Sequence, residues 1–197
     1  MAASICDSIQ QLNDLDPGEV KREQRRIYHD ELTRYPTLLV DITGLNRPRE
    51  FNEYNYRINR ELLRTCEGYE DQFSMLPLSK ILDLEGLFSE SEYDSLEGLI
   101  IQFIHLKKTD LVVVTLDDPY PFQDFASFVQ NKGEVWNIGG HYEKGGLMLV
   151  YSSVLKGFTA FTGNLTVENP SKTIFQYQQG RSGFEQLSQA IVQLLQE

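Results

Sequence analysis

Residues 89–116 read SESEYDSLEGLIIQFIHLKKTDLVVVTL and carry the clearest structural signal in the chain. Ser89 followed by Glu92 is a capping-box pattern, in which each side chain satisfies a free backbone N–H at a helix start. Apolar residues then recur at helical spacing, as expected for an amphipathic helix; they are Leu96, Leu99, Ile100, Phe103 and Ile104. After Lys107 and Lys108, the almost wholly apolar run 111–116 is typical of a central strand. The segment therefore predicts a helix over 89–107 followed by a buried strand.

Helical patterns dominate the sequence on the N-terminal side of this segment. Asp16 and Pro17 supply an N-cap and a first-turn proline. Pro36 ends the helix that they begin, because proline disfavours helical geometry at the preceding residue. The short apolar run 37–42, bounded by Pro36 and Gly44, predicts a buried strand. The helices predicted in this half cover residues 2–13, 17–35, 50–66 and 78–87.

Strand patterns dominate the C-terminal side. A helix is predicted over 121–130, closed by Gly133. Beyond it, β-branched and aromatic residues punctuated by glycines predict an antiparallel meander of about four strands, over residues 134–138, 147–154, 158–167 and 172–178. A closing helix is predicted over 182–196. The expected fold class is α+β, in a single domain with a helical segment at 1–35, a mixed part at 36–133, and the meander plus helix at 134–197.

The charge of the chain excludes some classes of partner and is concentrated in one segment. The net charge is −11, which argues against binding nucleic acid or an anionic membrane surface. The longest strongly apolar stretch, residues 99–106, is far shorter than the roughly 20 residues that span a bilayer. Residues 61–130 hold 4 basic and 14 acidic residues and so carry nearly all of the negative charge. We therefore expect an acidic surface that binds a partner protein with a basic surface.

The cysteines and the first residues of the chain suggest a compartment. Cys6 and Cys66 stand 60 positions apart, without a CxxC or Cys/His pattern, so the sequence predicts two reduced thiols. No secretory, transit or lipidation pattern is present. Both observations predict a cytoplasmic protein.

Two groups of residues are candidates for the partner-binding surface. One is acidic and consists of Glu85, Glu90, Glu92 and Asp94. The other is the loop 139–146, in which His141 and Tyr142 lie between two glycine pairs. This loop has the glycine spacing of a phosphate-binding loop but lacks the Lys and the Ser/Thr, so it is interpreted as a flexible hairpin tip that forms part of a binding surface.

A basic cluster near the N-terminus has a simpler interpretation. Lys21, Arg22, Arg25 and Arg26 are interleaved with acids, and Arg26 can reach both Glu23 and Asp30 at helical spacing. A self-paired, solvated helix face is therefore expected. Basic residues at the start of a helix oppose the helix dipole, so an acidic partner that binds this cluster is an alternative.

The sequence favours a non-enzymatic interaction protein, such as an adaptor, an assembly chaperone or an acidic inhibitor, because no complete catalytic motif is present. No cofactor is predicted. The alternative is a metal-dependent enzyme or small-ligand protein that uses the strand-end carboxylates Asp41, Asp117 and Asp118. A homodimer formed through the C-terminal strands and helix is a further alternative, because an exposed sheet edge must be paired or covered.

Overall fold

The chain divides into two compact units, residues 1–74 and 75–197. The computed structural model describes residues 2–12, 19, 22–24, 26–27, 30–31, 48–66, 69, 80–163 and 182–196. The predicted strands at 37–42 and 172–178 lie outside the described residues, as does most of the predicted helix at 17–35. The prediction of a single domain stays a prediction.

The described part of the first unit is helical. It consists of α1 (Ala2–Ile9), the 3-10 turn η1 (Gln10–Leu12) and α4 (Pro48–Thr65), which confirms the helices predicted at 2–13 and 50–66. α1 packs against α4. Their shared core buries Ile5, Ile9, Ile58 and Leu62 from the two helices together with Tyr69, which follows α4.

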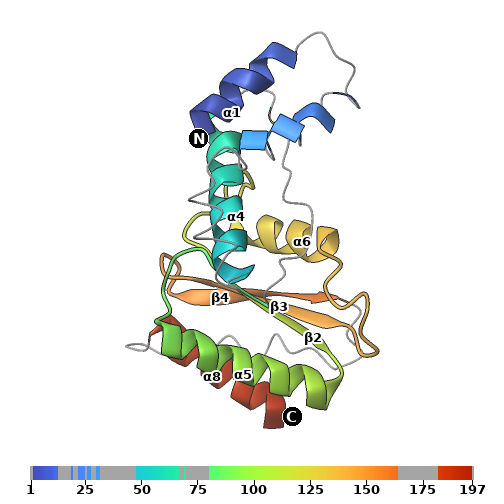
Figure 1. Ribbon diagram of the computed structural model, residues 1–197. Coiled ribbons are helices and arrows are strands. Elements are labelled where there is room, and N and C mark those ends of the chain that lie inside the picture. The colour runs from blue at the N-terminus through green and yellow to red at the C-terminus, as the bar shows by residue number, and fades with distance from the viewer. Residues whose placement is uncertain are drawn as a thin grey trace. The chain divides into compact units, whose positions relative to one another are not determined.

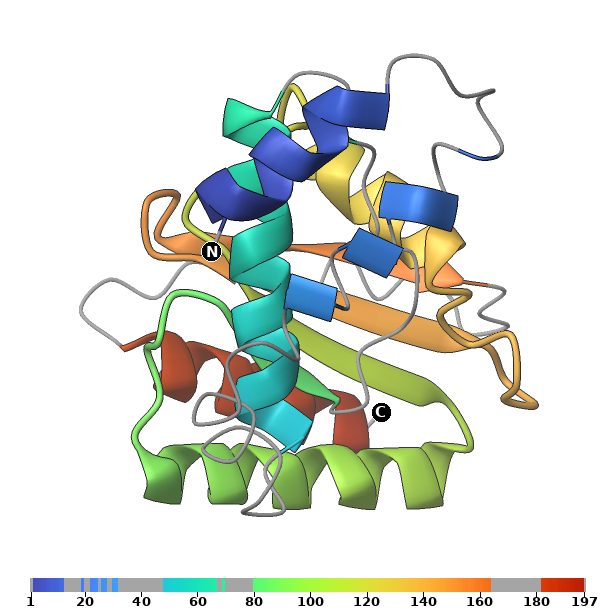
Figure 2. The same cartoon turned by 45° about the horizontal axis from the view of Figure 1, so that its top comes forward.

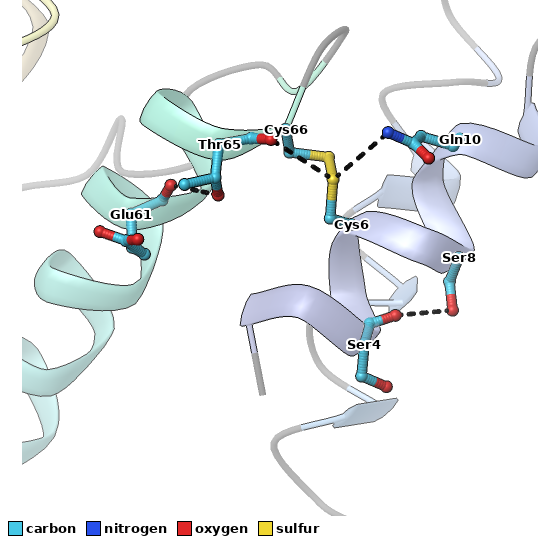
Figure 3. Close-up of a disulfide and its surroundings, with 7 residues drawn as sticks. All are labelled: Ser4, Cys6, Ser8, Gln10, Glu61, Thr65 and Cys66. Carbon is cyan, nitrogen blue, oxygen red and sulfur yellow. Dashed lines mark hydrogen bonds between the residues drawn. A yellow bond between two sulfur atoms is a disulfide. The ribbon is translucent and has the colours of Figure 1, made fainter.

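A disulfide joins these two helices. Cys6 and Cys66 are bonded, with their Cα atoms 5.3 Å apart, and Figure 3 shows the bond linking α1 to the end of α4. The prediction of two reduced thiols was therefore wrong. The spacing of 60 residues gave no indication of a pair, because packing of α1 on α4 brings the two cysteines together.

The second unit contains a four-stranded mixed sheet. Its strands are β1 (Ile81–Asp83), β2 (Asp110–Thr115), β3 (Gly146–Ser152) and β4 (Gly157–Gly163), in that spatial order. β1 and β2 are parallel, β2 and β3 are parallel, and β3 and β4 are antiparallel. The α+β class is confirmed. The predicted antiparallel meander was wrong, because β3 pairs with β2 in parallel and residues 134–138 belong to a helix end and a turn.

Helices cover both faces of this sheet. α5 (Glu90–Lys107) and α8 (Gly183–Gln196) pack together on one face, and α6 (Phe125–Val135) packs on β3 and β4 from the other (Figures 1 and 2). The core under α5 and α8 includes Leu111 and Val113 of β2. Val112 and Val114 alternate with them and are also fully buried, so β2 is a central strand with two covered faces. The predictions of a helix over 89–107, a strand over 111–116 and a closing helix are confirmed.

Two element predictions in this unit need correction. The described part of the predicted helix at 78–87, residues 80–87, is not helical, since Ile81–Asp83 is β1, paired with Val113–Thr115. A short apolar run fits a strand or a buried helix equally well, and pairing with β2 decides between them. The helix predicted at 121–130 begins later, after the N-cap Asp124, and continues past Gly133. A Cβ on Gly133 would lie 2.2 Å from the ring of Phe161, so this glycine permits close packing on β4 rather than ending the helix.

None of the helices in the described part of the chain is both long enough and apolar enough to cross a membrane.

Candidate functional site

The outward face of α5 carries the exposed acids predicted as a partner-binding surface. Glu90 and Asp94 are exposed, and so is Glu97 one turn further along, while Tyr93, Leu96 and Ile100 of the same helix are buried. The helix start is fixed by the predicted capping box, because Ser89 Oγ accepts from the Glu92 N–H and Glu92 Oε2 accepts from the Ser89 N–H. The cap holds this end of α5, and hence its three exposed carboxylates, in place.

Two of the predicted acids have contacts within the chain. The Ser89 hydroxyl also donates to Glu92, at 2.6 Å, and these hydrogen bonds hold the pKa of Glu92 below its ordinary value. Glu85 accepts hydrogen bonds from the backbone N–H and the hydroxyl of Ser153, in the turn between β3 and β4. Glu85 therefore lies in the connection before α5, beside the β3–β4 turn, and only Glu90 and Asp94 of the predicted set share the outward face of α5.

The loop that carries His141 and Tyr142 connects α6 to β3, so the prediction of a hairpin tip was wrong. Its C-terminal end is held by backbone hydrogen bonds, from Asp110 N to Gly145 O at 2.9 Å and from Lys144 N to Lys108 O at 3.2 Å. Gly139 has a φ of +81°, and a Cβ there would lie 2.1 Å from the backbone nitrogen of Gly146. Glycine is required at this position for both reasons. The loop therefore has a defined backbone conformation where it connects α6 to β3.

Tyr142 is further positioned by a cation. The ammonium of Lys80, just before β1, lies 5.5 Å from the centre of the Tyr142 ring. This separation is within the range of a cation–π contact. Lys80 therefore helps to place the loop against the start of the sheet.

A groove of about 440 Å³ lies between this loop and the C-terminal end of α5. The helix contributes two isoleucines and two basic side chains, and the loop contributes the rest of the lining; the residues are Ile101, Ile104, His105, Lys108, His141, Tyr142 and Glu143. α5 places Glu90 and Lys108 about 27 Å apart at 1.5 Å per residue. The structure therefore brings His141 and Tyr142 to the basic end of α5, at a distance from the predicted acids.

The helix side of this groove was not predicted from the sequence. Ile101 is the residue that could have indicated it, because it lies off the apolar stripe that faces the core and is 60% exposed. Contiguous exposed apolar patches with a polar rim mark interaction sites, and Ile101 lies together with Ile104 in the groove lining.

Among the residues that the structure describes, the strand-end carboxylates do not form a metal centre. Asp117 is exposed after β2, and Asp118 is half-buried and accepts from the backbone N–H of Tyr120 at 2.9 Å. Asp41 lies outside the described residues. Within the part that the structure describes, no group of three or more His, Cys, Asp or Glu residues could hold a metal ion. The shared site of these three aspartates stays a prediction.

Asp83 is a buried carboxylate at the same edge that sequence reasoning missed. It accepts from Thr115 Oγ1 at 2.5 Å and from the backbone N–H groups of Leu87 and Phe88 at 3.0 Å each. These contacts satisfy a carboxylate that is fully buried. Asp83 therefore holds the connection from β1 to α5 in place.

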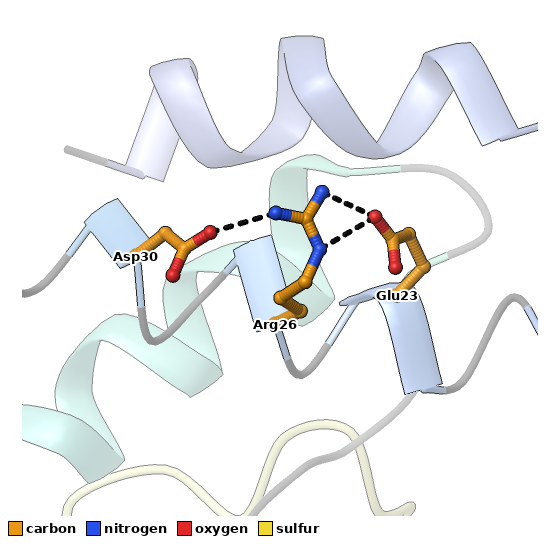
Figure 4. A network of polar contacts seen from close by, with 3 residues as sticks. All are labelled: Glu23, Arg26 and Asp30. Carbon is orange, nitrogen blue, oxygen red and sulfur yellow. Dashed lines mark hydrogen bonds and ion pairs between the residues drawn. The ribbon is translucent and has the colours of Figure 1, made fainter.

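Within the basic cluster, Arg26 pairs with acids of the chain as predicted, while Lys21 and Arg25 lie outside the described residues. Arg26 donates to Glu23 and, at 2.8 Å, to Asp30 (Figure 4). The hydrogen bond with Glu23 raises the pKa of Arg26, and the bond with Arg26 lowers the pKa of Glu23. Arg26 is therefore already engaged by acids of its own segment.

Comparisons with known proteins give likenesses among solved structures. No family model and no curated protein matches the chain. Among solved structures, the chain is similar to the N-terminal domain of a protein from P. gingivalis, determined by NMR in solution. The TM-score is 0.48 and the sequence identity 20%, over 59% of this chain and 80% of that one. Similarity of this degree supports no conclusion about function.

Proposed function

We propose that the chain is a protein-interaction module that binds a basic partner protein through the acidic half of α5. The observation that carries this proposal is the exposed row of Glu90, Asp94 and Glu97 on a helix whose other face is packed into the core. Complementary charge across an interface speeds association and disfavours wrong partners. An adaptor, an assembly chaperone and an inhibitor would each fit this description, and the identity of the partner would distinguish them.

The distribution of charge supports the same proposal. Residues 67–97 contain nine acidic residues and Lys80 as their one basic residue. Glu85 and Glu92 of this segment are engaged in hydrogen bonds with Ser153 and Ser89. Asp94 and Glu97 point their charge into solvent, where an isolated stability role would be small. Binding a basic partner would give these two acids a role beyond keeping the protein soluble.

The proposal is tested by charge reversal on the full chain. D94K/E97K reverses two of the three acids in the row, and D7K/E61K changes the net charge by the same amount at exposed positions in the other unit. Proteins crosslinked to the wild type in native lysate are identified, and each is then purified and titrated against both variants at several salt concentrations. We expect D94K/E97K to weaken binding and to flatten its salt dependence, while D7K/E61K binds like the wild type. Equal binding of both variants would contradict the proposal.

A cytoplasmic location stays a prediction, and the disulfide stands against it. Disulfides persist in oxidising compartments, whereas cytosolic thiols are kept reduced. The pairing state of Cys6 and Cys66 in protein trapped with a thiol-blocking reagent at the moment of cell lysis distinguishes the two environments. Blocked thiols at both positions would support a cytoplasmic location.

A further inference from the structure

The outward face of α5 is divided into two halves of opposite charge. The exposed side chains along it are Glu90, Asp94, Glu97, Ile101 and His105, and the exposed C-cap residue Lys108 continues the row. At 3.6 residues per turn these six positions fall within an arc of about 80°. The acids occupy the N-terminal half, His105 and Lys108 occupy the C-terminal end, and Ile101 lies between them. The helix therefore presents an acidic, an apolar and a basic patch in one straight row.

These patches are arranged symmetrically about Ile101. Asp94 precedes it by seven residues and Lys108 follows it by seven, while Glu97 precedes it by four and His105 follows it by four. If a second α5 lies antiparallel with Ile101 against Ile101, Asp94 of each copy faces Lys108 of the other, about 10 Å from the axis. Glu97 and His105 face each other in the same way. A surface that matches itself under a two-fold rotation is what an isologous dimer requires.

We propose that a second copy of this chain binds in this way, forming an antiparallel α5–α5 homodimer. The inference rests on the proposed function, because it names the basic end of another α5 as the basic surface that the acidic half recognises. The apolar centre is supplied by Ile101, which is 60% exposed. Burying such a side chain at the two-fold axis adds a hydrophobic contribution that the flanking charges alone lack.

The groove at the basic end of α5 receives the acidic half of the other helix. Ile101 and Ile104 form its apolar side, and His141 adds a second imidazole from the loop. Glu143 also lines the groove and opposes an incoming carboxylate, so the ionic attraction comes from Lys108, and the two imidazoles offer N–H donors for hydrogen bonds. A pair of helices of this length buries less than a standard interface of about 1,600 Å². The dimer is therefore expected to be weak and to depend on protein concentration.

Charge reversal separates this arrangement from other modes of association. D94K alone and K108D alone each place like charges opposite one another at both ends of the interface. The double variant D94K/K108D, and an equimolar mixture of the two single variants, restore opposite charges at both ends. Asp is among the residues that tolerate the left-handed backbone of position 108, where φ is +56°.

The test is sedimentation velocity of the full chain over a series of protein concentrations. We expect the wild type to dimerise, each single reversal to raise the dimer dissociation constant about tenfold or more, and the double variant and the mixture to recover dimerisation. I101R should abolish the dimer, while L106R, at a site on α5 that is 59% exposed and turned about 140° away, should not. Circular dichroism and melting temperature establish that each variant is folded.

Other outcomes overturn the inference in distinguishable ways. A wild-type chain that is monomeric throughout the series would rule out the homodimer. The proposed function would still stand if D94K/E97K no longer bound a basic partner protein. A dimer that persists in I101R and in both single reversals would place the interface elsewhere. If D94K/E97K also leaves all partners unchanged, the homodimer and the proposed function both fail.

Discussion

Lys80 Nζ lies 2.7 Å from Oδ1 of Asp110, although the two residues are 30 positions apart. The ion pair joins the residue before β1 to the first residue of β2, and the Asp110 side chain is only 3% exposed. Its other oxygen, Oδ2, accepts from the backbone N–H of Gly139 at 3.4 Å. The same pair therefore holds two parallel strands and the loop that forms one side of the groove.

Replacing Lys80 should destabilise the second unit. In K80M, Asp110 keeps its charge in a buried position without its cation, and loss of a hydrogen bond to a charged group lowers stability by about 1.5–3 kcal/mol. In K80M/D110N the buried charge is also removed, so part of the loss should be recovered. Urea denaturation of the full chain measures both effects. If K80M is as stable as the wild type, the pair does not have this role.

Breaking the disulfide should loosen α1 from α4. A crosslink between residues 60 positions apart restricts the unfolded chain, and the chain-entropy account gives about 4 kcal/mol for a loop of this length. In C6S/C66S we expect faster hydrogen exchange of the amides in α1 and α4, with exchange in β2 and β3 unchanged. Wild-type protein in dithiothreitol should behave like the variant. Unchanged exchange in α1 would show that packing alone holds it.

The start of α5 should respond to acid through Glu92. Its pKa is lowered in the folded chain, first by the Ser89 hydroxyl and then by the Ser89 backbone N–H. The stabilisation is therefore fully present above the ordinary glutamate pKa of about 4.3 and is lost as the pH falls through the lower pKa of the folded state. In E92Q a capping amide replaces the carboxylate and does not titrate in this range. Stability profiles of both proteins against pH should diverge below the ordinary pKa, and parallel profiles would contradict the assignment.

Two glycines in helices should respond oppositely to alanine. A Cβ at Gly133 would overlap the Phe161 ring, so G133A should destabilise the chain by about 1–3 kcal/mol. Gly98 of α5 is exposed, and a Cβ there would have no neighbouring atom within 4 Å, so G98A should stabilise the chain by up to about 1 kcal/mol. Thermal unfolding of the two variants compares these effects directly. A neutral G133A would show that α6 and β4 adjust to the added carbon.

The contrast between α5 and β1 explains how much of the fold could be predicted. The cap and the apolar stripe of α5 lie within one contiguous segment, so sequence was sufficient to identify the helix. β1 is only three residues long and becomes a strand by pairing with β2, about 30 residues away. The parallel pairing of β3 with β2 and the disulfide between Cys6 and Cys66 are non-local in the same sense.

The residues of the candidate site show the same contrast between local features, which the sequence predicts, and non-local ones, which it does not. The exposed acids Glu90 and Asp94 were predicted from local charge and capping. His141 and Tyr142 were singled out by the composition of their loop. Their position against Ile101 and Lys108 depends on how the loop is tied to the start of β2, which the sequence pattern does not encode.

Crosslinking at the centre of α5 tests the self-complementary surface most directly. The native cysteines are paired with each other, so I101C supplies one free thiol at the proposed two-fold axis and L106C supplies one on another side of the same helix. A disulfide forms readily only where two Cβ atoms come within about 3.5–4.5 Å. Under mild oxidation I101C should give a covalent dimer on a non-reducing gel, and L106C should remain monomeric. A monomeric I101C, or equal crosslinking of both variants, would contradict the account.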